Sequence, residues 1–238
     1  DDLEGGGGGV YMYQNSNPVM RRVIIANNST AGQGGGLWLF DTNPALLNVT
    51  ISGNTASYGG GTYLDWEDPY EGNLHSNPII INSIMWDNNP ESILIEEGAP
   101  DISLIAYSNI EEETENDNNG NIHLEPNFIN PQNNNFNLDP DSPCIDAGTS
   151  FFPLPNGLTI QLNPQQYYGP SPDMGSIEFY PDIITDLNHD QYQDILDIII
   201  LINIIINNEN YNILGDLNSD GLNDIRDIIE LLHIVLGN

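Results

Sequence analysis

Runs of three glycines recur along the first part of the chain at nearly constant spacing. Each run is followed by two residues, the second of them aromatic, as in Gly7-Gly8-Gly9-Val10-Tyr11, Gly34-Gly35-Gly36-Leu37-Trp38 and Gly59-Gly60-Gly61-Thr62-Tyr63. The three segments start at Gly7, which lies inside the longer glycine run 5–9, at Gly34 and at Gly59, so the two intervals between them are almost equal. A unit of this size cannot bury an apolar face alone, but stacked copies can share one continuous core. The spacing therefore favours a stack of repeats.

A second marker keeps the same register as the glycine runs. Three prolines are each followed, ten residues later, by an asparagine: Pro18 and Asn28, Pro44 and Asn54, and Pro78 and Asn88. The β-branched runs between the markers, such as Val23-Ile24-Ile25, are too short for helices. We expect residues 6–110 to form parallel stacked coils in which the three asparagines share one face and Val23, Val49 and Ser83 are equivalent. An antiparallel sandwich with glycine-rich turns is the alternative.

Two later segments resemble the end of a known repeat architecture. They read Asp141-Ser142-Pro143-Cys144-Ile145-Asp146-Ala147-Gly148 and Ser171-Pro172-Asp173-Met174-Gly175-Ser176-Ile177-Glu178. Together with the coils they resemble the closing part of secreted bacterial right-handed parallel β-helix proteins of the pectate-lyase-like superfamily. The resemblance implies a mainly β solenoid over residues 1–110 and a C-terminal cap with loops over residues 111–181. The mostly polar residues 111–136 are expected to form a long surface loop.

The charge balance excludes two classes of partner. The chain has 3 basic and 35 acidic residues, which leaves a formal charge of −32. Nucleic acids and anionic membrane surfaces both need clustered Lys and Arg, so neither is an expected partner. The longest apolar run, Ile195–Ile206, is interrupted by Asp197 and Asn203. It is far shorter than the roughly 20 residues that cross a bilayer, so membrane insertion is not expected.

The setting of the chain is inferred from its single cysteine, its first residues and its charge. Cys144 is the only cysteine, so no disulfide framework is expected, and a buried free thiol is its expected state. The chain opens with Asp1-Asp2-Leu3-Glu4-Gly5, which is neither a starting Met nor a leader pattern. We interpret it as the mature or truncated C-terminal portion of a secreted protein, a setting that the acidic surface also suits.

An acidic pattern near the C-terminal end occurs twice, first from Asp186 and again from Asp216. Both copies place side-chain oxygens at positions 1, 3, 5, 9 and 12 of a 12-residue loop and a backbone carbonyl at position 7, which is the spacing of a calcium loop. Each loop leads into an apolar stretch, residues 198–206 or 228–236, which is predicted to be helical. We predict two bound Ca²⁺ ions, with solvated helix-capping turns as the alternative. The candidate ligands are Asp186, Asn188, Asp190, Tyr192, Asp194 and Asp197 in the first loop, and Asp216, Asn218, Asp220, Leu222, Asp224 and Asp227 in the second.

This duplicated segment, residues 182–238, resembles the type I dockerin, an EF-hand-like loop–helix module. The resemblance implies a small all-α domain that binds cohesin-like protein domains. Gln191 replaces the turn glycine that Gly221 keeps, so the first loop is expected to bind its metal more weakly. The family's partner-reading positions carry apolar side chains and one cation rather than small hydroxyl residues. We expect the cohesin-like partner to bind one helix face built around these positions, Ile195, Leu196, Ile225 and Arg226.

Catalysis must also be considered, because the pectate-lyase-like superfamily that the chain resembles includes polysaccharide lyases and hydrolases. Such a lyase needs a basic residue, and before residue 182 the chain offers only Arg21 and Arg22, which as strand neighbours would point to opposite faces. Hydrolysis would need paired carboxylates, for which the acidic and aromatic residues 63–71 are the best candidates. We expect this chain alone not to cleave polysaccharides.

These expectations combine into an extracellular or cell-surface attachment protein. Its dockerin-like module would bind a cohesin-like domain, and its β-helix would contact a polysaccharide. The alternative is the C-terminal portion of a polysaccharide lyase or glycoside hydrolase whose catalytic coils lie largely upstream.

Overall fold

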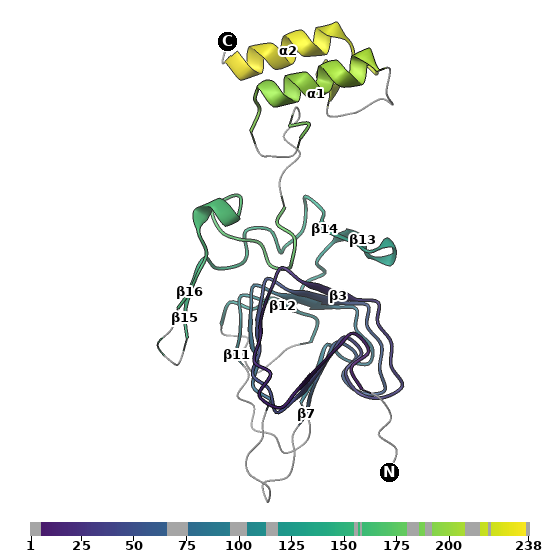
Figure 1. Cartoon of the computed structure of the whole chain (residues 1–238), viewed down its shortest axis with the longest axis vertical. Helices are drawn as coiled ribbons and strands as arrows, with labels where there is room; N and C mark the ends of the chain where they lie inside the picture. The colour runs from purple at the N-terminus through teal and green to yellow at the C-terminus, as the bar shows by residue number, and fades with distance from the viewer. Residues whose placement is uncertain are drawn as a thin grey trace, which may run out of the picture. The chain divides into compact units, whose positions relative to one another are not determined.

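The computed structural model describes residues 6–65, 76–95, 104–112, 119–154, 157, 159–179, 186–188, 192–207, 215–218 and 220–236. The chain divides into two compact units, Asp1–Phe179 and Tyr180–Asn238. In its described part the protein is mainly β, with parallel sheets of short strands in the first unit and two α-helices in the second (Figure 1). None of the described helices is long and apolar enough to span a membrane.

Three parallel sheets form the body of the first unit, and each takes one strand from every repeat. The first sheet consists, in spatial order, of β1 (Val10–Tyr13), β4 (Leu37–Phe40), β7 (Thr62–Asp65) and β10 (Ile93–Ile95). The second consists of β2 (Val19–Arg21), β5 (Ala45–Leu47), β8 (Ile79–Ile81) and β11 (Leu104–Ala106). The third consists of β3 (Ile24–Ala26), β6 (Thr50–Ser52), β9 (Ile84–Trp86) and β12 (Asn109–Ile110).

The expected parallel pairing of the repeats is confirmed, and its register agrees with the sequence markers. The residue that precedes each strand of the third sheet receives a hydrogen bond from the next repeat: Thr50 N–H donates to Val23 O at 2.9 Å, and Ile84 N–H donates to Val49 O at 2.9 Å. Ser83 O accepts in the same way from Asn109 N–H at 2.8 Å. Val23, Val49 and Ser83 are therefore equivalent, as expected.

Strand alternation divides each repeat into a buried and an outward side. In β4, Leu37 and Leu39 are completely buried, whereas Trp38 and Phe40 are half-buried. Successive side chains of a strand point to opposite faces, so the two leucines enter the interior and the two aromatic rings lie outside. Residues in equivalent positions, among them Met12, Leu46, Ile51, Leu64, Ile80, Met85 and Ile105, complete one continuous core.

The glycine runs allow neighbouring repeats to approach closely. The backbone N–H groups of Gly8 and Gly35 donate to the carbonyls of Gly34 and Gly59, at 3.0 and 3.1 Å. A Cβ atom on Gly35 would lie 2.4 Å from the carbonyl oxygen of Gly60, which is closer than real Cβ contacts allow. A side chain at this position would therefore push two repeats apart, which explains why the repeat uses glycine here.

The asparagines of the repeat form a continuous ladder inside the stack. The Asn54 side-chain oxygen accepts from the backbone N–H and the side-chain amide of Asn28, both at 3.0 Å. Asn88 Oδ1 accepts the corresponding two hydrogen bonds from Asn54, at 3.1 and 3.0 Å. The three asparagines thus share one face as predicted, and Asn54 is fully buried.

Residues after the last parallel strand cover the stack, and the expectation of one long surface loop over residues 111–136 is wrong in part. Ser108 N–H donates to Asn121 Oδ1 at 3.0 Å, which attaches this polar stretch to the stack. Strand β13 (Phe128–Asn130) then pairs with β14 (Asn135–Leu138), across the 3₁₀ turn η2 (Pro131–Asn133). A second antiparallel pair, β15 (Phe151–Pro153) and β16 (Thr159–Gln161), precedes the 3₁₀ turn η3 (Pro164–Gln166).

The two cap segments bind the corners of the stack. Asn48 donates its side-chain amide to the Asp173 carbonyl at 3.0 Å, and Thr50 Oγ1 is 3.0 Å from Ser176 Oγ. Asn82 donates to the Thr149 carbonyl at 2.9 Å in the same way. Asn48 and Thr50 belong to the second repeat and Asn82 to the third, so the cap segments complete hydrogen bonds of the middle repeats.

The cap also buries two carboxyl groups next to each other. Asp173 is 2% exposed and Glu178 is 8% exposed. Glu178 accepts hydrogen bonds from the backbone N–H groups of Tyr168 and Asp173, and Asp173 accepts one from Asp146 N–H at 2.8 Å. Burial is the main cause that raises the pKa of Asp173 to about 6 and that of Glu178 to about 7, because the charged form loses water.

The second unit has two helices of equal length, α1 (Ile195–Ile206) and α2 (Ile225–Leu236). Their contact is built on Ile198, Leu201 and Leu231, with Leu187 from the first loop. The predicted helices are confirmed, but both begin three residues earlier than the apolar stretches at 198 and 228. The last acidic residue of each loop therefore lies in the first helical turn.

We predict that Asn54→Ala destabilises the first unit by about 3 kcal/mol, because it leaves buried amide groups of the ladder without partners. All three tryptophans lie in this unit, so urea unfolding followed by tryptophan fluorescence measures it. Asn43→Ala is the matched control, since Asn43 makes a similar contact between repeats but is exposed. It should cost less than about 1 kcal/mol. Equal losses for both variants would contradict the role assigned to the buried ladder.

Candidate metal-binding loops

Each of the two acidic loops ends by capping its own helix. Asp194 is the N-cap of α1, and its Oδ1 accepts the Leu196 N–H at 2.7 Å. Asp197 completes a capping box, because its Oδ2 accepts the Asp194 N–H at 2.9 Å. The second loop repeats both bonds at 2.8 Å, from Arg226 N–H to Asp224 and from Asp224 N–H to Asp227.

The last acidic residue of each loop also ties the loop to its helix. Asp197 Oδ1 accepts the backbone N–H groups of Leu187 and Asn188, at 2.8 and 3.2 Å. Asp227 Oδ1 accepts those of Leu217 and Asn218, at 2.9 and 3.3 Å. Both aspartates are completely buried. Each of them therefore accepts three backbone hydrogen bonds, and the two loops share one hydrogen-bonding plan.

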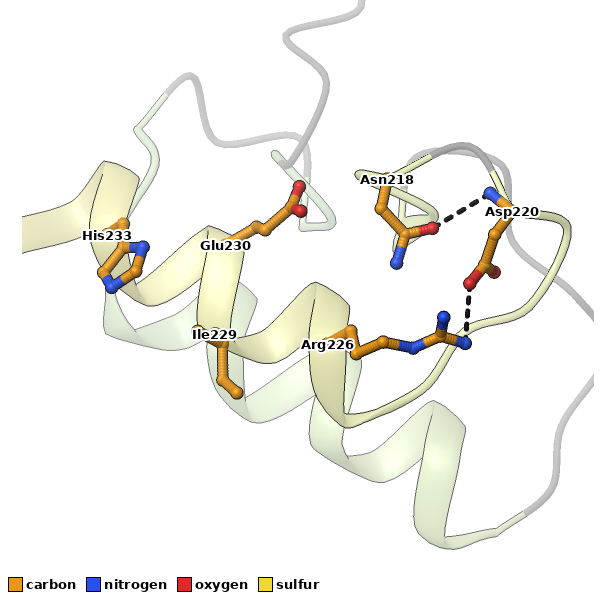
Figure 2. A pocket seen from close by; sticks show the side chains of 6 residues that line it. All are labelled: Asn218, Asp220, Arg226, Ile229, Glu230 and His233. Atoms are coloured by element: carbon orange, nitrogen blue, oxygen red, sulfur yellow. Dashed lines mark hydrogen bonds and ion pairs between the residues drawn. The ribbon is translucent and has the colours of Figure 1, made fainter.

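Asp216, the first residue of the second loop, fixes the turn of that loop through hydrogen bonds to its backbone. Asp216 is 6% exposed and accepts the backbone N–H groups of Asp220 and Gly221, at 3.0 and 2.8 Å. Gly221 has a φ of +84°, which disfavours any residue with a side chain. Asn218 Oδ1 also accepts the Asp220 N–H, at 2.9 Å (Figure 2). The acidic oxygens are thus turned toward the inside of the loop by its own backbone.

The first loop agrees with the second wherever it is described. Asp186 is 6% exposed, like Asp216 at the equivalent position. Tyr192 and Leu222 have exposed side chains, which fits the expectation that their position contributes only a backbone carbonyl. Asp190 and Gln191 lie outside the described residues.

Arg226 adds a cation to the second loop. Its Nη2 atom lies 2.6 Å from one carboxylate oxygen of Asp220 (Figure 2). The same atom lies 2.6 Å from one carboxylate oxygen of Asp224. This contact lowers the pKa of Asp224, since the hydrogen bonds from Arg226 favour the charged carboxylate. Asp220 and Arg226 line a shallow open groove, together with Asn218, Ile229, Glu230 and His233.

The donor set of the loops has the chemistry that a calcium ion requires. Calcium binds six to eight oxygen ligands from carboxylates, amides and carbonyls, and every candidate position offers one of these. An ionised carboxylate has about four lone-pair sites, so the aspartates that accept backbone N–H groups keep capacity for a cation. Within the described ranges, however, no three Asp, Glu, His or Cys side chains are grouped closely enough to hold a metal ion as they stand.

The other sequence candidates are separated in the structure. Asp65 is the last residue of β7 in the first sheet, where one of its oxygens accepts the Trp38 indole N–H at 3.1 Å. Residues 66–71, the remainder of the acidic candidate segment, lie outside the described part of the chain. Arg21 belongs to β2 of the second sheet, and the Arg22 guanidinium donates to the Gln166 carbonyl. The two arginines and Asp65 are therefore not neighbours within one sheet.

The sequence analysis foresaw two features of the loops only in part. Asp194 and Asp197 were assigned as ligands with helix capping as the alternative, and the structure shows the capping box that their spacing of three residues before an apolar run permits. Arg226 was assigned to partner recognition, although the structure pairs it with two of the loop's own carboxylates. The signal for the second feature was the isolation of this cation, because residues 182–238 contain no other Lys or Arg.

We predict that Asp227→Asn destabilises the helical unit by about 2 kcal/mol even in the presence of a chelator, because the new NH₂ group replaces an acceptor of backbone hydrogen bonds. Thermal unfolding followed by circular dichroism at 222 nm measures it. Glu230→Gln on the same helix is the control, since Glu230 is exposed, and it should leave the midpoint unchanged. A midpoint that falls only when calcium is present would contradict the hydrogen-bonding role.

Comparison of the chain with models of protein families, with curated proteins and with solved structures finds no significant match.

Proposed function

We propose that this chain is an extracellular attachment protein, in which a right-handed parallel β-helix carries a dockerin-like module that binds two calcium ions and a cohesin-like protein domain. The observation that carries the proposal is the pair of loop–helix units that share their hydrogen bonds. Asp197 and Asp227 occupy equivalent positions in the two copies, and each accepts the same three backbone N–H groups of its own loop. A pattern repeated in this detail belongs to a duplicated module, and oxygen-rich duplicated loops before helices suit calcium.

The β-helix assignment is supported by the course of the repeats. Each repeat contributes one strand to the first sheet, then one to the second and one to the third, in the same order every time. Every strand pairs in parallel with its equivalent in the neighbouring repeat. This regular winding with closely spaced glycine and asparagine columns is what a stacked solenoid requires.

The proposed partner surface is supported by exposed apolar side chains at the helix starts. Ile195 is 57% exposed, Leu196 is 48% exposed and Ile225 is 63% exposed. Large apolar residues cost solubility when they stay uncovered, and several of them on one small unit are typical of a protein–protein interface. None of the three packs into the helical core, so all are accessible to a partner within this unit.

An extracellular setting is supported by charge and by the state of the cysteine. An acidic chain with 35 carboxylate side chains and two metal loops suits a medium that supplies millimolar calcium. Cys144 is completely buried, and burial raises the pKa of its thiol to about 11. A thiol that keeps its proton is a poor nucleophile, so the chain resists oxidation outside the cell.

We predict that the helical unit of the full chain melts at higher temperature in calcium than in a chelator. At 100 times the dissociation constant, each site should contribute about 2.7 kcal/mol. Calorimetric titration should give two ions for each chain, and circular dichroism at 222 nm should follow the melt. Magnesium at equal ionic strength is the control for a nonspecific salt effect. An unchanged melt after chelation would show that the loops are acidic turns without a metal.

We further predict calcium-dependent capture of the full chain by members of a cohesin panel. The double variant Ile195→Asp with Ile225→Asp should lose capture by at least tenfold, because it places charge in the proposed interface. Ile129→Asp is the matched control, since Ile129 is 55% exposed in the first unit and should not contact the partner. If the chain binds calcium but no cohesin of the panel captures it, the proposed partner is rejected and the proposed metal sites stand.

Contact with a neutral polysaccharide is a second candidate function, supported by aromatic side chains on the outward face of the first sheet. Tyr11 and Trp38 are partners in register, with ring centroids 4.6 Å apart, and Tyr13 stacks on Phe40 at 5.2 Å. Tyr11 is 47% exposed and Tyr13 is 46% exposed. Aromatic faces pack against the apolar C–H faces of sugars, and the chain's charge of −32 disfavours an acidic glycan.

We predict that neutral glycans retard the chain in affinity electrophoresis and that Tyr11→Ala weakens this retardation about fivefold, the loss of roughly 1 kcal/mol of ring contact. Phe151→Ala is the control, since Phe151 is 55% exposed elsewhere in the same unit. Polygalacturonate should give no retardation because of charge repulsion. Retardation that is equal for both variants would contradict a site on the first sheet.

A further inference from the structure

We propose that Arg226 is a built-in counter-cation of the second loop, which offsets part of the loop's negative charge in the absence of metal and lowers its affinity for calcium. The inference rests on the calcium binding proposed above and adds a means of regulation to it. It predicts different calcium affinities for the two loops, although their candidate ligands are of the same kind at every position. Besides the turn residue, Gln191 in the first loop and Gly221 in the second, the loops differ at the position before the last aspartate, which is Leu196 in the first loop and the cation Arg226 in the second.

The guanidinium of Arg226 contacts carboxylates that are candidate ligands. Its Nη2 atom is 2.6 Å from Asp220 Oδ2 and 2.6 Å from Asp224 Oδ2, and its Nε atom is 3.1 Å from both oxygens of Asp224. In Figure 2 the side chain reaches from the start of α2 across to Asp220. Arg226 thus spans position 5 and position 9 of the loop.

This contact competes with a metal for the same oxygens. Asp220 has one oxygen on Arg226 and the other on the Leu222 N–H, at 3.1 Å. A calcium ion that takes Asp220 as a ligand must share this carboxylate with the guanidinium or displace it, and it meets the positive charge in either case. The Arg226 side chain is 56% exposed, so the ion pair is weak enough to yield to a divalent ion.

The sequence of the first loop contains neither Lys nor Arg. Leu196 occupies the position of Arg226, and its backbone N–H caps the helix through Asp194 just as the Arg226 N–H does through Asp224. The nearest basic residue in the sequence before the first loop is Arg22. The first loop therefore has no arginine of its own in its sequence, whereas the second loop has Arg226 beside two of its carboxylates. Both helix starts have the same capping hydrogen bonds, so we expect Arg226 to give the metal-free second loop an additional stabilising contact.

Reciprocal substitutions in the full chain test this inference. Calcium affinity of the second loop is measured by calorimetry in an Asp186→Ala background, which removes a candidate ligand from the first loop. In that background, Arg226→Leu should raise the affinity about tenfold at low salt, and the gain should shrink at 0.5 M salt. Arg226→Lys keeps the charge and should stay close to the parent. In an Asp216→Ala background, Leu196→Arg should weaken the first loop by a similar factor.

A metal-free measurement gives an independent readout. In a chelator, Arg226→Leu should lower the melting midpoint at 222 nm, because the second loop loses its counter-cation, whereas Leu196→Arg should raise it. If the two background variants, Asp186→Ala and Asp216→Ala, bind calcium and Arg226→Leu changes neither the calcium affinity nor the metal-free melting midpoint, the counter-cation role is overturned while calcium binding stands. If no variant binds calcium, Arg226→Leu included, both the calcium sites and this inference are overturned.

Discussion

A repeat of the first unit can satisfy its backbone hydrogen-bonding groups only against the repeats on either side of it. Each repeat crosses three sheets, and in each sheet its single strand pairs with the preceding and the following repeat. A short strand alone leaves its N–H and C=O groups unpaired, which is costly once the apolar side chains beside it are buried. Register between repeats is therefore the constraint on which the core, the glycine columns and the asparagine ladder depend.

This constraint explains which parts of the fold could be predicted from the sequence. A repeat that must match its neighbours leaves a period that can be read directly, so the equivalence of Asn28, Asn54 and Asn88 followed from spacing alone. The cap has no period, because its segments fit the corners of the stack at residues such as Asn48 and Asn82 rather than one another. The polar composition of residues 111–136 therefore indicated a loop. The structure instead has strand β13 there, and Asn121 accepts a hydrogen bond from Ser108 of the stack.

The acidic loops were predictable in position but not in their full role. The duplication located the ligand-type residues, yet an aspartate that can bind a metal can equally accept backbone N–H groups, and Asp197 and Asp227 do the latter in both copies. The start of each helix was predicted too late for the same reason, since Ile195 and Ile225 were counted with the loops. Pairing of Arg226 across its own loop depends on side-chain reach in space, which periodicity does not encode.

The cap of the first unit also reduces the negative charge of the folded chain. Asp173 and Glu178 are buried side by side, and their pKa values of about 6 and about 7 lie above those of exposed carboxyl groups. An unfolded chain at neutral pH has released both protons, whereas the folded cap holds back part of them. Folding of this unit is thus coupled to proton uptake, and the stability that these two carboxyl groups contribute is present at low pH and is lost as the pH rises through about 6 to 7. The formal charge of −32 consequently describes the unfolded chain better than the native one.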